Sequence, residues 1–333
     1  HFSRLPLPFF LPVVLAVGVR FGLRAIVLSL GRIRRPVALP EADPAGHGPE
    51  VWVFGATSVI GRYLLPRLLA AGYRVRAFCT DPVAAGVIGT PRLVWHSLRL
   101  GEEPCLPAGK GQPFVLVHLA PLPLLVPWIK PLVDIGLTRL IAFGSTSRYT
   151  KQDSVNPKER RLAQALAAAE TEVAAHCGRW QVPWAVFRPT MIYCLGHERN
   201  ITLLAGFIRR FRFFALPGEG RGLRQPVHAD DLARACVQRL GSDVGWNRGY
   251  NLSGGQTLSY RAMVEAVFRR LGLKPRFVTL PRWTWQTALG LIRLLPGYRD
   301  INVQMLERVD QDMCFDHGDA SRDWAYLPRP FQP

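Results

Sequence analysis

The sequence lacks the motifs that define several enzyme classes. Its six cysteines lie far apart and include no C-x-x-C pair, which argues against a zinc site and a disulfide framework and fits a reducing compartment. It contains no G-x-S-x-G segment and no H-E-x-x-H segment, so we expect neither hydrolase chemistry of that kind nor metal chemistry. No metal site is predicted.

Lysine and the acidic residues are also scarce. The chain carries 42 Lys and Arg against 24 Asp and Glu, a net charge of +18, and only five of the 42 are lysines. A GC-rich genome would produce such an arginine bias. The functional alternative is that the positive charge attracts anionic lipid, acidic partner subunits or phosphate-bearing ligands. Because no basic segment is interleaved with stacking aromatics in a recognised module, we expect no nucleic-acid partner.

The amino-terminal segment is apolar. Residues 9–31 are long enough for a membrane-spanning helix of about 20 residues. Arg20 and Arg24 share one helical face in its second half, so the segment either spans the membrane or lies in its interface. Three arginines follow directly and place the next domain on the cytoplasmic side by the positive-inside rule. We expect a membrane anchor or interfacial helix over residues 1–35 and a proline-rich linker over residues 36–49.

Residues 51–75 are the most informative stretch. An apolar strand pattern leads into Gly55-Ala-Thr-Ser-Val-Ile-Gly61, and a helical pattern follows and stops at Gly72 before a second strand near Arg74. Gly55 permits a tight turn, and Gly61 lets helix and strand pack closely. The N–H groups at the start of the helix are offered to a pyrophosphate. This order predicts the βαβ unit of a dinucleotide-binding fold.

Further apolar runs alternate with helical patterns. Residues 114–119, 140–143 and 184–187 have the pattern of buried strands, and residues 161–176 that of a helix. This alternation predicts an α/β fold with a Rossmann-type doubly wound parallel sheet. We expect a dinucleotide-binding core over residues 50–193. A smaller substrate-type lobe over residues 194–333 should exchange a strand and a helix with it.

Seven motifs occur in a recognisable order: GATSVIG at 55–61, VHLA at 117–120, RLIAFGSTSRY at 139–149, RPTMIY at 188–193, RQPVHADDLA at 224–233, YNLSGG at 250–255 and FDHGDASRDWAYLPRPF at 315–331. With them the chain resembles the extended or atypical short-chain dehydrogenase/reductases of the NAD-dependent epimerase/dehydratase type. The resemblance covers nearly everything after residue 50. It implies that NAD or NADP contacts Gly55, Thr57, Ser58, Val59, Ile60, Gly61, Arg62, Cys79, Thr80, Leu119, Ala120, Gly144, Ser145, Pro189, Thr190 and Ile192.

The cofactor motif departs from the family at two places. Ser58 replaces a glycine that lets backbone approach the pyrophosphate, so it either narrows the site or donates its hydroxyl to a phosphate. Cys79 stands where the family has an acidic residue for the adenosine ribose. With Arg62 and Arg76 available for a 2′-phosphate, NADP is favoured over NAD, a preference that Asp81 would reverse.

The catalytic helix departs further. The family places an acid/base Tyr and, four residues later, a Lys on the helix that ends in Ala-Glu. Counting back from residues 169–170 puts Leu162 and Leu166 at these positions, and none of the eight tyrosines has a lysine four residues on. Both leucines are expected in the apolar stripe of a packed helix. The usual proton-transfer pair is therefore absent.

Some catalytic candidates remain. Ser145 matches the third catalytic position, where it would orient a carbonyl or contact the cofactor. Tyr149 and Tyr193 end the GSTSRY and RPTMIY motifs near the expected cofactor edge, and they are the candidates for an unconventional acid.

The substrate-type pocket has its own candidates. Arg224 resembles the family arginine that contacts a nucleotide-sugar diphosphate, and Asn200 would assist it. The alternative for Arg224 is an ion pair with Asp230 or Asp231. We expect His228 to be a packed or hydrogen-bonding residue rather than a base.

Two other segments could touch a membrane. One alternates Arg209, Arg210 and Arg212 with Phe207, Phe211, Phe213 and Phe214, and it faces anionic lipid, a partner or simply solvent. The other, residues 281–296, is apolar with Trp283 and Trp285 at its start, which suits a membrane interface or domain packing.

Three functions are considered. The first is an NAD(P)-binding, catalytically inactive accessory subunit, membrane-associated and bound to lipid and other membrane-protein subunits. It would be similar to the short-chain-dehydrogenase-like accessory subunit of respiratory complex I, which shares a GAT-x-x-x-GRY opening. The alternative is an active epimerase, dehydratase or reductase on a nucleotide-sugar or lipid-linked substrate. A redox-state sensor that signals through a partner is a third class.

Overall fold

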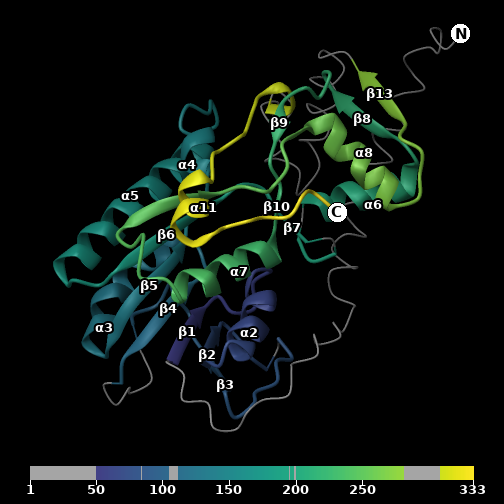
Figure 1. Cartoon of the computed structure of the whole chain (residues 1–333). Helices are drawn as coiled ribbons and strands as arrows, with labels where there is room; N and C mark the ends of the chain where they lie inside the picture. The colour runs from purple at the N-terminus through teal and green to yellow at the C-terminus, as the bar shows by residue number, and fades with distance from the viewer. Residues whose placement is uncertain (1–49, 84, 105–111, 195, 199, 281–307) are drawn as a thin grey trace, which may run out of the picture.

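A seven-stranded parallel sheet forms the centre of the protein (Figure 1). The structure is a computed structural model that describes residues 50–83, 85–104, 112–194, 196–198, 200–280 and 308–333. The strands run in the order β11-β6-β5-β4-β1-β2-β3, and the chain order reverses between β1 and β4. Their bounds are β1 Glu50–Phe54, β2 Arg74–Cys79, β3 Leu93–Ser97, β4 Phe114–His118, β5 Leu137–Phe143, β6 Trp184–Pro189 and β11 Arg248–Leu252. The predicted α/β Rossmann-type fold is confirmed.

Helices cover both faces of this sheet, so its inner strands are buried on both sides. In β1, Val51 and Val53 face one layer, whereas Trp52 and Phe54 face the other. One layer contains α2 (Gly61–Ala70), α7 (Ala229–Leu240) and α11 (Gly318–Trp324). The opposite layer contains α3 (Ile129–Asp134) and α5 (Pro157–Arg179), with the 3-10 turns η2 (Leu122–Leu124) and η3 (Val126–Trp128).

The long helix α5 shows how local sequence sets an element. It contains the predicted helix 161–176 but starts earlier, because Pro157 occupies the first turn, where no N–H bond is lost. The Asn156 side chain caps this start by accepting from the N–H of Lys158 at 2.9 Å. The short helix α4 (Ser147–Thr150) precedes it after β5.

A smaller lobe lies beside the sheet, at the upper right of Figure 1. Its helices α6 (Asn200–Phe211) and α8 (Tyr260–Arg270) pack on each other around Ile208 and Val264. Its strands are short: β7 (Ile192–Tyr193), β8 (Phe214–Pro217), β9 (Leu223–Arg224), β10 (Val227–His228), β12 (Leu258–Ser259) and β13 (Phe277–Leu280), with the 3-10 turn η4 (Arg308–Asp310). The chain after residue 194 also returns β11, α7 and α11 to the large domain.

Ion pairs tie the carboxyl-terminal tail to the helix that follows the glycine motif. Arg67 of α2 donates to both carboxylate oxygens of Asp230 on α7, at 2.6 and 2.8 Å. Arg329 of the tail donates to Asp230 at 2.6 Å and to Asp231 at 3.0 Å. Burial alone would raise the pKa of Asp230, but the hydrogen bonds from Arg67 and Arg329 hold it below its ordinary value.

The expected membrane segments are not among the described residues. The predicted anchor 1–35, the linker 36–49 and the apolar stretch 281–296 all lie outside them. Within the part of the chain that is described, no helix is both long and apolar enough to cross a bilayer.

Candidate functional site

The glycine loop occupies the carboxyl edge of the sheet, between β1 and α2. Gly55 has a φ of +72°, and a Cβ there would lie 3.0 Å from the backbone nitrogen of Ala120. A Cβ on Gly61 would lie 2.1 Å from the carbonyl oxygen of Ala56, so neither position admits a side chain. The N–H groups of Thr57 and Val59 have no acceptor among the described residues. This loop fits a dinucleotide pyrophosphate.

Ser58 fills the place of the missing glycine without blocking the loop. Its backbone N–H donates to the carbonyl of Gly55 at 2.9 Å, and its Oγ accepts from the N–H of Gly61 at 3.1 Å. The side chain therefore caps the start of α2 and keeps its hydroxyl hydrogen for another acceptor. Of the two roles predicted for Ser58, this geometry suits donation to a phosphate.

The residues predicted at the adenosine end lie together beyond β2. Cys79 ends the strand and is buried, and this burial raises the pKa of its thiol. Thr80 and Asp81 follow it at the surface. Arg62 lies in the first turn of α2, and its Nη1 forms a hydrogen bond of 2.6 Å with Nδ1 of His197.

The prediction that Arg76 is available for a 2′-phosphate is wrong. Its Nε forms an ion pair of 2.7 Å with Glu50, and its guanidinium lies 5.4 Å from the ring centroid of Trp52. Glu50 begins β1, so this pair lies toward the amino ends of the strands, away from the glycine loop. The argument for NADP loses one of its two arginines, and the choice between NAD and NADP stays a prediction.

The other predicted cofactor contacts gather at the carboxyl ends of three more strands. Leu119 and Ala120 follow β4, Gly144 and Ser145 follow β5, and Pro189 ends β6 before Thr190. Oγ of Ser145 accepts from the N–H of Ser147 at 3.1 Å, which fixes the first turn of α4. Ile192 lies a little further on, in β7.

Only one of the two leucines on α5 belongs to the packed stripe. Leu166 is 7% exposed and lies in the core between α5 and the sheet. Leu162 is 44% exposed, so the prediction that it is packed is wrong. An aliphatic side chain at this position transfers no proton.

Tyr149 on α4 lies beside a buried charge cluster. It is 41% exposed and its ring stacks on Phe315, with centroids 5.8 Å apart. The guanidinium groups of Arg148 and Arg188 lie 5.1 and 5.7 Å from its ring centroid, and both arginines are ion-paired with the buried Glu170. Burial alone would lower the pKa of Arg188, but Glu170, with a smaller contribution from Tyr149, raises it. Tyr149 thus has fixed cations beside its phenol.

Tyr193 has a different environment. Its side chain is 1% exposed, and its hydroxyl accepts from the backbone N–H of Gln332 at 3.1 Å. Burial raises the pKa of this phenol. Its ring packs edge-on against His228, whose Nδ1 accepts from the N–H of Asp230 at 3.1 Å and caps α7. This placement argues against Tyr193 as a proton donor, and it makes His228 a packed cap, as expected.

Arg224 is buried without a carboxylate partner among the described residues. Its Nη1 donates to the carbonyls of Leu223 at 2.8 Å and Gln311 at 2.6 Å, and its Nη2 donates to the carbonyl of Arg308. Burial lowers its pKa. The alternative of an ion pair with Asp230 or Asp231 is wrong, because the guanidinium lies against carbonyl oxygens instead. Asn200 begins α6 at the surface.

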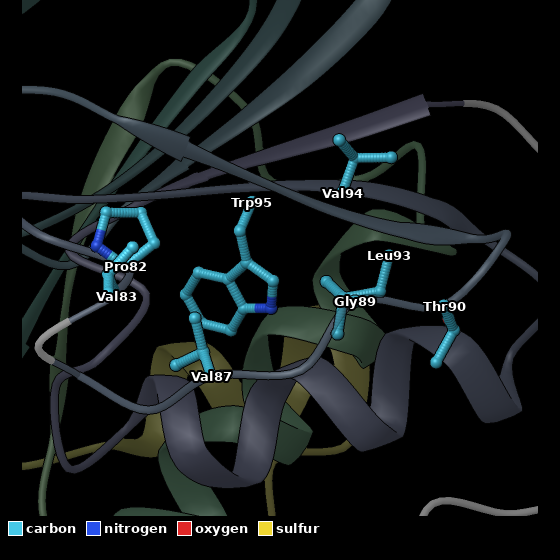
Figure 2. Close-up of a pocket in the computed structure, with 8 residues that line it drawn as sticks. All are labelled: Pro82, Val83, Val87, Gly89, Thr90, Leu93, Val94 and Trp95. Atoms are coloured by element: carbon cyan, nitrogen blue, oxygen red, sulfur yellow. The ribbon is translucent and has the colours of Figure 1, made fainter.

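Sequence reasoning gave no sign of an apolar hollow at the edge of the sheet. It has a volume of about 330 Å³ and lies between β3 and the segment before it. Figure 2 shows the Trp95 ring in its middle, with Val87 and Pro82 beside it. None of the predicted site residues lines it, so it lies apart from the glycine loop.

His118 leads to a prediction on pH. It ends β4, directly before the cofactor wall, and burial lowers its pKa to about 4. Between pH 6.5 and 4 the unfolded chain takes up a proton that the folded chain excludes, so stability falls as pH falls through this window. The shift corresponds to about 3 kcal/mol. Urea unfolding from pH 7 to pH 4 should show this loss in the wild type and lack it in His118→Gln.

The matched control is His176→Gln, on α5. It removes a histidine from the helix surface and should keep the pH dependence of the wild type. Parallel stability curves for the wild type and His118→Gln would contradict the prediction.

Two curated relatives are similar to most of the chain, although no family model matches it. One is the uncharacterized protein y4nG of Sinorhizobium fredii, 22% identical over 92% of this chain and 78% of that protein. The other is the uncharacterized oxidoreductase YesF of Bacillus subtilis, 24% identical over 70% of this chain and 74% of that protein.

Solved structures share the fold over nearly their whole length. The UDP-glucuronic acid 4-epimerase of Bacillus cereus, in complex with UDP-glucuronic acid and NAD, matches with a TM-score of 0.64 and 14% identity, over 85% of this chain and 95% of that one. The dTDP-glucose 4,6-dehydratase of Bacillus anthracis, in complex with NAD, matches with a TM-score of 0.60 and 14% identity, over 86% of this chain and 93% of that one. The similarity to the complex I accessory subunit stays a prediction. The chain has the fold of NAD-dependent epimerases and dehydratases of the short-chain dehydrogenase/reductase type.

Proposed function

We propose that this protein is an NAD(P)-dependent epimerase, dehydratase or reductase that acts on a nucleotide-sugar or lipid-linked substrate. The observation that carries the proposal is the loop from Gly55 to Gly61, where backbone approaches so closely that neither glycine position admits a Cβ. That loop lies at the carboxyl edge of the sheet, next to the point where strand order reverses, the usual ligand position in doubly wound folds. Bound NAD(P) would supply a hydride acceptor and donor there.

The residues of this chain divide the remaining work. The N–H groups before α2 and the Ser58 hydroxyl would hold the pyrophosphate. Ser145 would orient the reacting carbonyl or hydroxyl of the substrate. Tyr149 would accept or return its proton, since Leu162 cannot, with Arg188 as the fixed cation that a lysine provides in the resembling family.

The charge on Arg224 supports a phosphate-bearing substrate. Three carbonyl oxygens hold the guanidinium, yet no carboxylate among the described residues forms an ion pair with it. A buried cation without a counter-charge is costly, and a diphosphate would supply the missing negative charge. The epimerase and dehydratase with this fold act on UDP- and dTDP-linked sugars, which points to the same class of substrate.

The experiment combines nucleotide analysis with turnover. Nucleotide released by heat from the purified full chain should be NAD(H) or NADP(H) in stoichiometric amount. The protein should convert the sugar of UDP-glucose, UDP-glucuronic acid or dTDP-glucose. NMR of the reaction mixture would detect this conversion. Absence of nucleotide, together with failure of added NAD and NADP to raise the melting temperature, would overturn the proposal.

A second function is favoured by Leu162 and Leu166. With no Tyr–Lys pair on α5, the nucleotide would serve as a structural ligand that stabilises the native domain by mass action. In that case the protein would be a membrane-associated accessory subunit of a larger membrane complex. Co-purification with such a complex from native membranes, with bound nucleotide and no sugar conversion, would favour this function over the first.

A further inference from the structure

Four elements of the small lobe meet at one end. Strands β8 and β13 pair in parallel, with Phe214 opposite Phe277, and the N–H of Phe214 donates to the carbonyl of Arg276 at 2.8 Å. Helix α6 runs directly into β8, and α8 leads through residues 271–276 into β13. The last turns of both helices and the first residues of both strands therefore lie side by side, at the upper right of Figure 1.

This end of the lobe is strongly basic. Residues 200–217 and 260–280 contain eight basic side chains and one acidic one, Glu265, which pairs with Arg261 at 3.4 Å. The other seven are exposed, and no described Asp or Glu forms an ion pair with any of them: Arg209, Arg210, Arg212, Arg269, Arg270, Lys274 and Arg276. We call them the basic lobe surface. Of these residues, Arg270 donates from Nε to an oxygen of Pro333 at 3.0 Å. Elsewhere among the described residues many arginines have carboxylate partners, as Arg67 and Arg248 do.

Apolar side chains border these cations. Leu203 on α6 is 51% exposed and Val278 on β13 is 38% exposed. Phe213, just after α6, is half-buried, and its ring meets that of Phe207 edge-on at 5.9 Å. The opposite side of α6, which includes Ile201 and Ile208, is packed in the core of the lobe. An amphipathic helix of this kind, with arginines beside exposed apolar groups, suits the boundary between lipid headgroups and acyl chains.

We propose that the basic lobe surface docks this protein onto a bilayer that contains anionic lipid. Seven exposed cations, none of them paired with a described Asp or Glu, complement a negative surface, and each adds to the binding free energy when it lies near that surface. Leu203 and Phe213 supply an apolar component that a purely electrostatic partner does not require.

Vesicle binding tests the proposal. Flotation of the full chain with vesicles of equal parts phosphatidylcholine and phosphatidylserine should show binding that weakens as salt rises. Combined Arg209→Gln and Arg210→Gln should lower the affinity for these vesicles by about 30-fold, from about 1 kcal/mol for each arginine. Binding to pure phosphatidylcholine vesicles, which the amino-terminal segment alone could provide, should not change.

The matched control removes two exposed arginines from the large domain, Arg99→Gln with Arg179→Gln, and should bind the anionic vesicles like the wild type. An unchanged melting temperature and nucleotide content would show that each variant is folded. Equal losses of vesicle affinity in both double variants would show that the effect depends only on the net charge of the protein, and this result would overturn the proposal. Undiminished vesicle binding by the Arg209/Arg210 variant, with lost binding to a DNA duplex, would assign the surface to nucleic acid instead.

Discussion

Replacement of Tyr149 by phenylalanine is expected to lower turnover of a nucleotide-sugar substrate by about 10²- to 10⁴-fold, the usual contribution of a positioned acid or base. Tyr149 is an exposed phenol on α4, four residues after Ser145, and it has Arg148 and Arg188 beside its ring. Phenylalanine keeps the stack on Phe315 and removes only the hydroxyl. Rates of sugar conversion and the dissociation constant for NAD measure the effect, which should fall on kcat and spare cofactor binding.

Tyr193→Phe is the matched control. It removes the other candidate hydroxyl, which is buried and accepts from the backbone N–H of Gln332. The substitution should lower the free energy of unfolding by about 1 kcal/mol and leave turnover nearly unchanged. Full activity in Tyr149→Phe would remove Tyr149 from the mechanism. If turnover were lost in Tyr193→Phe alone, the proton path would run through the small lobe and the assignment here would be wrong.

The sheet was largely predictable because its inner strands carry uninterrupted apolar runs. Residues 51–54, 114–119, 140–143 and 184–187 all lie in or overlap strands of the central sheet. The outer strands gave no such signal. β3 pairs on one side only and exposes Val94, and β11 contains Gly249 and Asn251, which disfavour strands in isolation. Their place comes from pairing with β2 and β6, a tertiary effect that a local pattern does not contain.

The positions of site residues were predictable where backbone geometry dictates the residue type. They were less predictable where a partner distant in the sequence sets the direction of the side chain. Gly55 and Gly61 can be recognised in the sequence because only glycine fits a turn with positive φ or a close contact with a backbone oxygen. Arg76 lies on the expected strand, but its direction is set by Glu50, on a strand that pairs with it only after folding. Arg224 is held by carbonyls more than 80 residues away, which sequence spacing does not reveal.

The glycine loop gives the other large expected effect. Gly61→Ala would place a Cβ 2.1 Å from the Ala56 carbonyl oxygen, a backbone atom with no freedom to move aside as a flexible side chain would. The loop must shift, and with it the N–H of Gly61, its bond to Ser58 and the donors of Thr57 and Val59. We expect a stability loss of about 3 kcal/mol from overpacking. NAD affinity should fall about 100-fold, because charge-assisted bonds to the pyrophosphate are displaced.

Gly206→Ala is the same substitution in the middle of α6, where a Cβ meets nothing within 4 Å. It should raise stability by about 0.5–1 kcal/mol, because alanine restricts the unfolded chain and favours the helix. Urea unfolding and calorimetric titration with NAD would measure both variants. If stability falls in Gly61→Ala and rises in Gly206→Ala, the loss at Gly61 comes from its close contact with backbone. A general intolerance of alanine would lower the stability of both variants. Normal NAD affinity in Gly61→Ala would mean that the nucleotide does not use this loop, which would also remove the main support for a dinucleotide-dependent reaction.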